Sequence, residues 1–150
     1  MTRRGLLCWL LAPAASPGRS VFDAVNRERV RRRGKALVWN EELAEAARQH
    51  SESMARHGFF SHVDPRRGDL VERLKGAGIR YAACAENIYT QSGGRDAVSA
   101  ACAAWMKSAG HRANILNARY AVSGVGVAVG RGGACFFTQI FVGRSESQPG

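Results

Sequence analysis

The sequence predicts an α+β domain in which helices pack on an antiparallel sheet. Apolar residues recur at helical spacing through the first two thirds of the chain and alternate with period two in the last third. The length of 150 residues fits one domain, and an apolar share of 45% is ordinary for a globular protein. Because helical segments come first and a hairpin comes last, we expect an α+β architecture over residues 20–143 and a frayed tail at 144–150.

The first sixteen residues have the character of an export signal. Arg3 and Arg4 precede a short apolar run, and Ala12-Pro13-Ala14 has the small-x-small form of a cleavage site. We therefore expect residues 1–16 to be a short signal peptide and the protein to be secreted or held in the cell envelope. An apolar N-terminus without a targeting role is the alternative. No run approaches the ~18 apolar residues of a membrane span, so we expect no transmembrane segment.

The charge balance favours anionic partners. The chain has 22 Lys and Arg against 12 Asp and Glu, a formal net charge of +10. Such a charge promotes contact with nucleic acid, phospholipid headgroups or envelope polymers. Export and the lack of a helix-turn-helix or zinc-finger pattern argue against nucleic acid, which leaves a lipid or an anionic envelope polymer as the expected partner.

The first helix is expected to begin at Ser20, to turn Val21 and Val25 inward and to end at Gly34. Its outer face and tail carry the residues that we expect to contact an anionic surface: Arg27, Arg31, Arg32 and Arg33. A solvated basic face is the alternative interpretation of this arginine run.

Two more helices and an apolar segment follow. Asn40 is expected to cap a second helix that ends at Gly58. His50 falls on its core-facing side, where a buried structural histidine is favoured over a ligand. Asp69 caps a short third helix, and residues 79–89 then form a mostly apolar segment.

The last third contains a fourth helix and a hairpin. Asp96 is expected to cap the helix, which presents an apolar stripe to the core, and residues 108–116 are expected to form a polar turn. Alternation over residues 125–129 and 136–141 predicts two strands, which the glycine-rich segment 131–133 joins as a hairpin turn. Glycines inside the first of these strands indicate close packing or a bulge.

Three cysteines would remain after removal of the leader, which contains Cys8. Cys84, Cys102 and Cys135 could supply one disulfide and one free thiol, or three buried thiols that behave as small apolar residues. The pairing is left open by the spacing. No C-x-x-C motif is present, which argues against a structural zinc knuckle.

Three polar residues are the candidates for a functional site. His62, Glu86 and His111 are separated by 24 and 25 residues, and each lies outside the predicted core stripes. Glu86 stands in an apolar run, where a carboxylate needs a partner or a cleft. Two imidazoles and one carboxylate could hold a divalent ion such as zinc with one position open, or carry out acid–base chemistry near neutral pH.

A nucleophilic hydrolase is less well supported. Cys84, Ser61 and Ser108 are the candidate nucleophiles. Cys84 has no basic neighbour in sequence to lower the pKa of its thiol, and no G-x-S-x-G motif occurs.

Ordered motifs give the chain a family resemblance. They are Phe60-Ser61-His62, Ala85-Glu86-Asn87-Ile88, Trp105-Met106-x-Ser108-x-Gly110-His111-Arg112-x-Asn114-Ile115-Leu116-Asn117, Gly124-Val125-Gly126-Val127 and Thr138-Gln139-x-Phe141. In this order the chain resembles the CAP superfamily of cysteine-rich secretory, antigen 5 and pathogenesis-related proteins. It is most similar to the bacterial SCP-like extracellular domains.

The resemblance implies a three-layer α-β-α sandwich with a central antiparallel sheet. It also implies a cleft with two histidines and two glutamates, which binds zinc or magnesium in some members. His62, Glu86 and His111 match three of these four positions, and Ser108 occupies the position of the second glutamate. Loss of that carboxylate removes a charge and a ligand, which weakens the case for tight binding of a divalent metal.

Three functions are compatible with these residues. We expect a secreted, non-catalytic module that binds a lipid or an envelope ligand at the His62/Glu86/His111 cleft and requires no cofactor. One alternative is a metal-assisted hydrolase of peptide or cell-wall bonds, with Glu86 as the base. The other is a structural or protein-interaction module in which the three polar side chains satisfy one another by hydrogen bonds.

Overall fold

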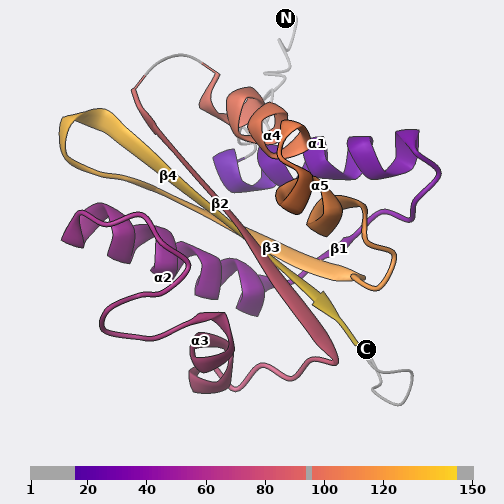
Figure 1. Ribbon diagram of the computed structural model, residues 1–150, viewed down its shortest axis with the longest axis horizontal. Helices are drawn as coiled ribbons and strands as arrows, with labels where there is room; N and C mark the ends of the chain where they lie inside the picture. The colour runs from indigo at the N-terminus through magenta and orange to yellow at the C-terminus, as the bar shows by residue number, and fades with distance from the viewer. Residues whose placement is uncertain (1–15, 94–95, 145–150) are drawn as a thin grey trace, which may run out of the picture.

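A four-stranded sheet forms the middle layer of the molecule (Figure 1). The computed structural model describes residues 16–93 and 96–144. The strands are β1 (Val38–Trp39), β2 (Ala83–Ser92), β3 (Val122–Val129) and β4 (Ala134–Gly143), in the spatial order β1-β3-β4-β2. The three long strands pair antiparallel, as predicted, and the two-residue β1 adds a parallel pairing to β3. The short 3-10 turn η1 (Arg131–Gly133) joins β3 to β4 at the predicted hairpin.

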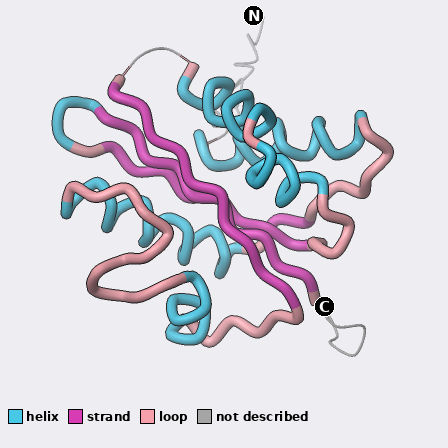
Figure 2. The backbone as a smooth tube through the Cα atoms, in the orientation of Figure 1, coloured by secondary structure: helices cyan, strands magenta, loops and turns pink. Residues whose placement is uncertain are grey.

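Helices cover both faces of this sheet. On one face lie α2 (Glu41–His57) and α3 (Leu70–Gly76), and on the other lie α1 (Pro17–Arg31), α4 (Ala97–Lys107) and α5 (Ala109–Leu116) (Figures 1 and 2). The predicted three-layer α-β-α sandwich is therefore confirmed. Strand β2 lies at one edge of the sheet.

Two apolar clusters fill the spaces between the layers. Trp105, Phe137 and Phe141 belong to the cluster under α1, α4 and α5. Leu43 and Leu74 belong to the cluster under α2 and α3. These side chains are at most 2% exposed, so each contributes roughly 1.5–3 kcal/mol through burial.

Two glycines let α2 lie directly on the sheet. A Cβ at Gly124 would overlap the backbone of Ala44, and one at Gly126 would overlap the backbone of Arg48. Of the two interpretations of these glycines, close packing or a bulge, the structure shows close packing.

The helix ends test the capping predictions. Asn40 caps α2, Gly58 ends it in the left-handed conformation, and Asp69 caps α3 through a capping box. The first helix begins earlier than predicted, with Ser16 as its cap and Pro17 in the first turn, because a fixed proline φ is well suited to that position.

Two expectations for the fourth helical segment are corrected. The Asp96 side chain does not cap α4, since the residue is left-handed, with φ of 58°, and makes no capping bond. Residues 109–116 form the helix α5 rather than a turn. Ile115 is fully buried and anchors this short helix to the core, and tertiary packing of this kind overrides the weak local preference of a glycine- and histidine-containing segment.

The predicted leader, residues 1–16, lies outside the described residues except for Ser16, as does the tail beyond Arg144. In the part that is described, Cys84, Cys102 and Cys135 are all free thiols. No disulfide therefore joins these three cysteines, and of the three expected buried thiols only Cys102 is buried, whereas Cys84 and Cys135 are partly exposed. Over residues 16–93 and 96–144, no helix combines the length and apolarity that a bilayer crossing requires.

Candidate functional site

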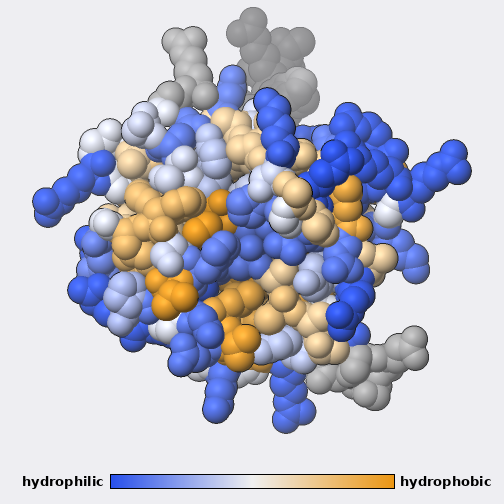
Figure 3. Space-filling view, viewed as in Figure 1, coloured by the Kyte–Doolittle hydropathy of each residue, from blue (hydrophilic) through white to orange (hydrophobic). Residues whose placement is uncertain are grey.

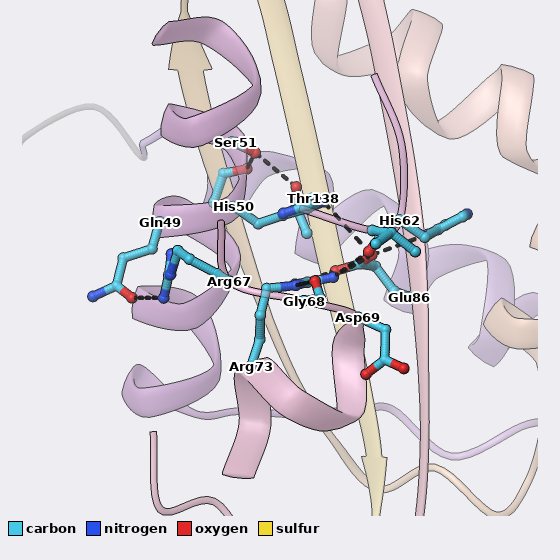
Figure 4. Close-up of polar contacts among 12 residues, drawn as sticks. Gln49, His50, Ser51, His62, Arg67, Gly68, Asp69, Arg73, Glu86 and Thr138 are labelled. Carbon is cyan, nitrogen blue, oxygen red and sulfur yellow. Dashed lines mark hydrogen bonds and ion pairs between the residues drawn. The ribbon is translucent and has the colours of Figure 1, made fainter. Parts of the chain in front are cut away.

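A buried ion pair lies at the edge of the sheet. Glu86 is on β2, and its carboxylate is directed to the α2 and α3 side of the sheet (Figure 4). Arg73 of α3 donates to both carboxylate oxygens, from Nη1 to Oε2 at 2.8 Å and from Nη2 to Oε1 at 2.9 Å. The two side chains are only 1% and 2% exposed. A buried bidentate pair of this kind compensates both charges and fixes the relative position of α3 and β2.

Two histidines contact the same carboxylate region. His62, in the loop between α2 and α3, places Nδ1 2.9 Å from Glu86 Oε1, and its side chain is 52% exposed. Because an ionised carboxylate only accepts hydrogen bonds, Nδ1 of His62 carries the proton in this contact. Arg73 also donates from Nη2 to the His62 carbonyl at 2.9 Å, which holds the loop against α3.

His50 lies on the inner side of Glu86. It is fully buried on α2, as predicted. Its Nε2 is 2.9 Å from the carbonyl oxygen of Ser61 and 3.9 Å from Glu86 Oε1. Since the carbonyl must accept, Nε2 carries the proton, and Nδ1 is buried with no hydrogen-bond partner among the residues that the structure describes. His50 therefore supports the loop that presents His62, and it is also a buried group that resists protonation.

Burial and neighbouring charges set the protonation states. Burial alone would raise the pKa of Glu86, but hydrogen bonds from His62 and Arg73 and the charge of Arg73 hold that pKa below its ordinary value. Burial lowers the pKa of His50, although the charge of Glu86 partly opposes this. Burial also lowers the pKa of His111, and the charge of His62 lowers it further. Near neutral pH the site thus contains a carboxylate that is already paired and at least two neutral imidazoles.

The next residue along β2 faces the opposite layer. Successive side chains of a strand alternate between its faces, so Asn87 is directed to α5 where Glu86 is directed to α3. Asn87 donates from Nδ2 to the carbonyl of His111 at 3.1 Å and accepts from Asn114 Nδ2 at 2.9 Å. These bonds tie the first turn of α5, and with it His111, to the edge strand.

A cavity of about 520 Å³ opens between these elements, and we call it the histidine cleft. Three of the predicted cleft residues line it, namely His62, Ser108 and His111. Its remaining wall is mostly apolar and comes from Phe60, Ile88, Tyr89, Ala104 and Trp105, with Ser61 and Thr90. Glu86, the fourth predicted cleft residue, does not line the cleft but contacts it through His62.

The predicted metal ligands do not form a metal site. Among the residues that the structure describes, no three His, Cys, Asp or Glu side chains are grouped closely enough to hold a metal ion. The physical reason is that both oxygens of Glu86 are engaged by Arg73, and Ser108 supplies no carboxylate. The set His62, Glu86 and His111 therefore does not fit zinc or magnesium in this arrangement.

The four predicted surface arginines separate into two groups. Arg32 and Arg33 line a second cavity at the end of α1. Arg27 and Arg31 lie beside Asp23 on the other side of the helix. Arg31 and Arg32 both pair with Glu28, so part of this charge is compensated locally.

Two residues of the site were not among the predicted set. Arg73 was not singled out, although the buried Glu86 required a cationic or hydrogen-bonding partner. Helical spacing predicts that His50 is a core residue, but it does not predict the contact of His50 with the His62 loop. The only available signal was the need of Glu86 for a partner, and that need does not identify which arginine meets it.

Three layers around a four-stranded sheet, with two histidines in a cleft beside the edge strand, define the class of this protein as an α-β-α sandwich domain. Within that class, the chain belongs to the CAP family, the cysteine-rich secretory protein family, whose model matches residues 22–141. The resemblance found in the sequence is thus confirmed.

Bacterial proteins are among the relatives of the chain. The uncharacterized membrane protein YlbC of Bacillus subtilis (strain 168) is 35% identical over 127 residues, which are 84% of this chain and 34% of YlbC. YkwD of the same organism is 33% identical over 126 residues, which are 84% of this chain and 47% of YkwD. The chain therefore spans between about a third and a half of the length of these relatives.

Solved structures show the same fold. An extracellular protein containing a SCP domain from Bacillus anthracis has 33% identity and a TM-score of 0.77, over 86% of this chain and 40% of that one. A cysteine-rich secretory protein from Staphylococcus aureus has 23% identity and a TM-score of 0.65, over 85% and 39%. The second likeness supports the fold alone, and the first also supports a bacterial SCP-like domain.

Proposed function

We propose that this domain is a non-catalytic binding module that acts outside the cytoplasm and holds one lipid in the histidine cleft. The observation that carries the proposal is the direction of Glu86. Its carboxylate is bound to Arg73 and is absent from the cleft lining, so the cleft offers imidazoles and apolar surface instead of a free acid. The leader-like residues 1–16 support an extracytoplasmic location.

The shape and the chemistry of the cleft suit an amphiphile. A volume of about 520 Å³ lies within the range of roughly 300–1,000 Å³ that is usual for small-molecule sites. Trp105, Ile88 and Phe60 would contact an apolar chain, and His62 and His111 would meet a polar head. Neutral His111 has one ring N–H, which can donate to a carboxylate or hydroxyl head. The Nδ1–H of His62 is already donated to Glu86, so its Nε2 is the ring atom left for the head group.

The hydrolase alternative has weaker support. A base within the cleft would have to be an imidazole, since Glu86 is held by Arg73 and none of the described residues groups into a metal site. No acidic side chain is among the described residues that line the cleft, since Glu86 pairs with Arg73 and Ser108 lies where the family resemblance implies a glutamate. A purely structural role would not account for an open, mostly apolar cleft lined by two histidines.

Titration calorimetry with laurate tests this proposal. Ala104 lines the cleft, so Ala104→Phe should fill it and weaken laurate binding by at least about tenfold, which corresponds to ~1.4 kcal/mol. Ala103, its exposed neighbour on α4, provides the matched control Ala103→Phe, which should bind laurate as the wild type does.

The two histidines are tested with a second ligand. His62→Ala combined with His111→Ala should weaken the binding of laurate more than that of dodecanol, because an N–H bond to a carboxylate is stronger than one to a hydroxyl. Wild-type protein that bound neither amphiphile, or an Ala104→Phe variant that bound laurate normally, would contradict a lipid site in the histidine cleft.

A further inference from the structure

A second cavity, of about 770 Å³, lies at the C-terminal end of α1, and we call it the basic cavity. The segment after α1 and the segment between α5 and β3 form its walls. Four of its lining residues are cationic: Arg29, Arg32, Arg33 and Lys35. The rest are apolar or small, including Val38, Leu116 and Tyr120, and no acidic side chain lines it. It shares no lining residue with the histidine cleft.

Arg29 places a buried positive charge beside this cavity. The residue is 3% exposed, and its guanidinium donates to the carbonyls of Lys35 and Ile115 at 2.7 Å and of Asn117 and Tyr120 at 3.1 Å. These bonds use four of its five N–H groups. In the described part of the chain no carboxylate pairs with Arg29, so carbonyl dipoles alone balance its charge. Burial without an ionic partner lowers the pKa of Arg29.

Arg33 has a backbone conformation that glycine would adopt more readily. Its φ is 65°, at the end of α1, where a left-handed residue is usually glycine. A non-glycine residue in this region costs roughly 1–2 kcal/mol. Among the described residues, neither Arg33 nor Lys35 forms an ion pair, in contrast to Arg31 and Arg32, which pair with Glu28. An arginine is thus kept at a strained position without a protein partner for its charge.

Apolar side chains lie beside these cations. Val38 lines the basic cavity and is 65% exposed. In the space-filling view, strongly hydrophilic side chains gather over the C-terminal end of α1, next to hydrophobic surface (Figure 3). Cations next to exposed aliphatic groups are the combination that binds an anionic membrane interface, where the charges meet headgroups and the aliphatic groups enter the acyl boundary.

We propose that the basic cavity binds the phosphate headgroup of an anionic phospholipid at a membrane surface. Arg33 and Lys35 contact the phosphate, the buried Arg29 adds a fixed positive field behind it, and Val38 inserts beside the glycerol region. A free phosphate ion shares the charge but makes no apolar contact with the exposed Val38, which is why the site is assigned to a lipid. This binding is independent of any ligand in the histidine cleft.

Co-sedimentation with vesicles tests the assignment. The 150-residue chain should bind vesicles of phosphatidylglycerol and phosphatidylcholine in equal parts, but not vesicles of phosphatidylcholine alone. Arg33→Gly combined with Lys35→Gln should lower this binding by about 30-fold, because a basic residue near an anionic surface is worth roughly a fivefold factor. Glycine suits the φ of Arg33, so this variant is expected to fold.

Matched controls separate a headgroup site from diffuse attraction. Arg56 and Arg66 are exposed residues that do not line the basic cavity, and Arg56 belongs to α2 in the opposite layer. Arg56→Gln with Arg66→Gln removes the same charge, and should lower vesicle binding by less than about threefold. An equal loss in both double variants would overturn the proposal, because net charge alone would then explain binding.

Two further results distinguish the source of the phosphate and the two sites. Glycerol phosphate that displaced the protein from vesicles at equal concentration of phosphate groups would show a free-phosphate site and overturn the lipid assignment. Ala104→Phe should leave vesicle binding unchanged. Wild-type protein that bound vesicles but not laurate would contradict the lipid site in the histidine cleft alone. Wild-type protein that bound laurate but not vesicles would contradict the headgroup site in the basic cavity alone.

Discussion

The guanidinium of Arg73 and the carboxylate of Glu86 meet through two hydrogen bonds in a place that excludes water. The bonds are 2.8 and 2.9 Å long, and the side chains are 1% and 2% exposed. Because this pair also contacts His62 through both partners, it positions the histidine cleft without lining it. Its removal should therefore disturb both the stability and the ligand binding of the domain.

Arg73→Ala is expected to destabilise the fold by about 3–5 kcal/mol, since it leaves the Glu86 carboxylate buried and unpaired. Urea unfolding followed by circular dichroism measures this loss. The double variant Arg73→Met with Glu86→Met should recover most of the stability, because both charges are then absent. A single variant within about 1 kcal/mol of the wild type would mean that the pair is not buried as described.

As the pH is lowered from 6.5 toward the pKa of His50 in the folded protein, the free energy of unfolding is expected to decrease. Burial lowers the pKa of His50, so the unfolded chain binds a proton there that the folded chain does not. Stability then rises with pH in this window, by up to about 1.4 kcal/mol per pH unit for one proton, and His111, whose pKa is also lowered, adds a slope of the same sign. The pKa of Glu86 is lowered too, but its contribution is lost only below about pH 4.5, so the two effects are separable.

Urea midpoints measured from pH 5 to pH 7.5 check this dependence. His50→Gln should flatten the slope, since the side chain keeps a donor for the Ser61 carbonyl and loses its titration. His57→Gln, which removes an exposed imidazole at the end of α2, is the matched control. Equal slopes in the wild type and in His50→Gln would show that His50 does not resist protonation in the fold.

Ser108→Glu is expected to create zinc affinity, which we expect to be absent from the wild type. In the wild type, Glu86 is held by Arg73, so zinc or a chelator should leave the melting temperature unchanged. A glutamate at position 108 adds a carboxylate to the cleft that contains His62 and His111. Calorimetry should then detect zinc, and His111→Ala in the same background should abolish the signal.

Position 109 supplies the control for this variant. Ala109 is exposed and does not line the cleft, so Ala109→Glu adds the same charge without adding a cleft ligand. Wild-type protein that bound zinc at micromolar concentration, with loss of binding in His111→Ala, would contradict the view that Arg73 occupies the carboxylate.

Local sequence rules account for most of the fold. The caps at Asn40 and Asp69 and the alternation in β3 and β4 follow from residue chemistry within one element. Helix α5 could not be predicted from local rules, because Gly110 and His111 weaken its helix preference. Its stability comes from the packing of the buried Ile115 against core residues from other parts of the chain. The boundary of α1 was misplaced since Ser16 and Ser20 are both competent caps, and only Pro17 favours the first.

The site was predictable only in part. That Glu86 would be buried and would need a partner follows from the apolar run around it. Which of nineteen arginines pairs with it is decided by how α3 packs against β2, and no spacing in the sequence encodes that contact. The sequence identifies His111, which lines the cleft beside His62. The Glu86 carboxylate, expected in the cleft with these two histidines, is paired with Arg73 instead.

Asn87 provides a last prediction, because it is the polar link between the edge strand and α5. Asn87→Ala removes the bond to the His111 carbonyl and leaves the amide of Asn114 without its acceptor. The loss should cost about 1–3 kcal/mol of stability. It should also weaken laurate binding in the histidine cleft, since His111 is no longer held by β2. Vesicle binding at the basic cavity should not change, because none of these residues lines it. A stable Asn87→Ala variant with normal laurate affinity would show that α5 is held in place by apolar packing of Ile115 alone.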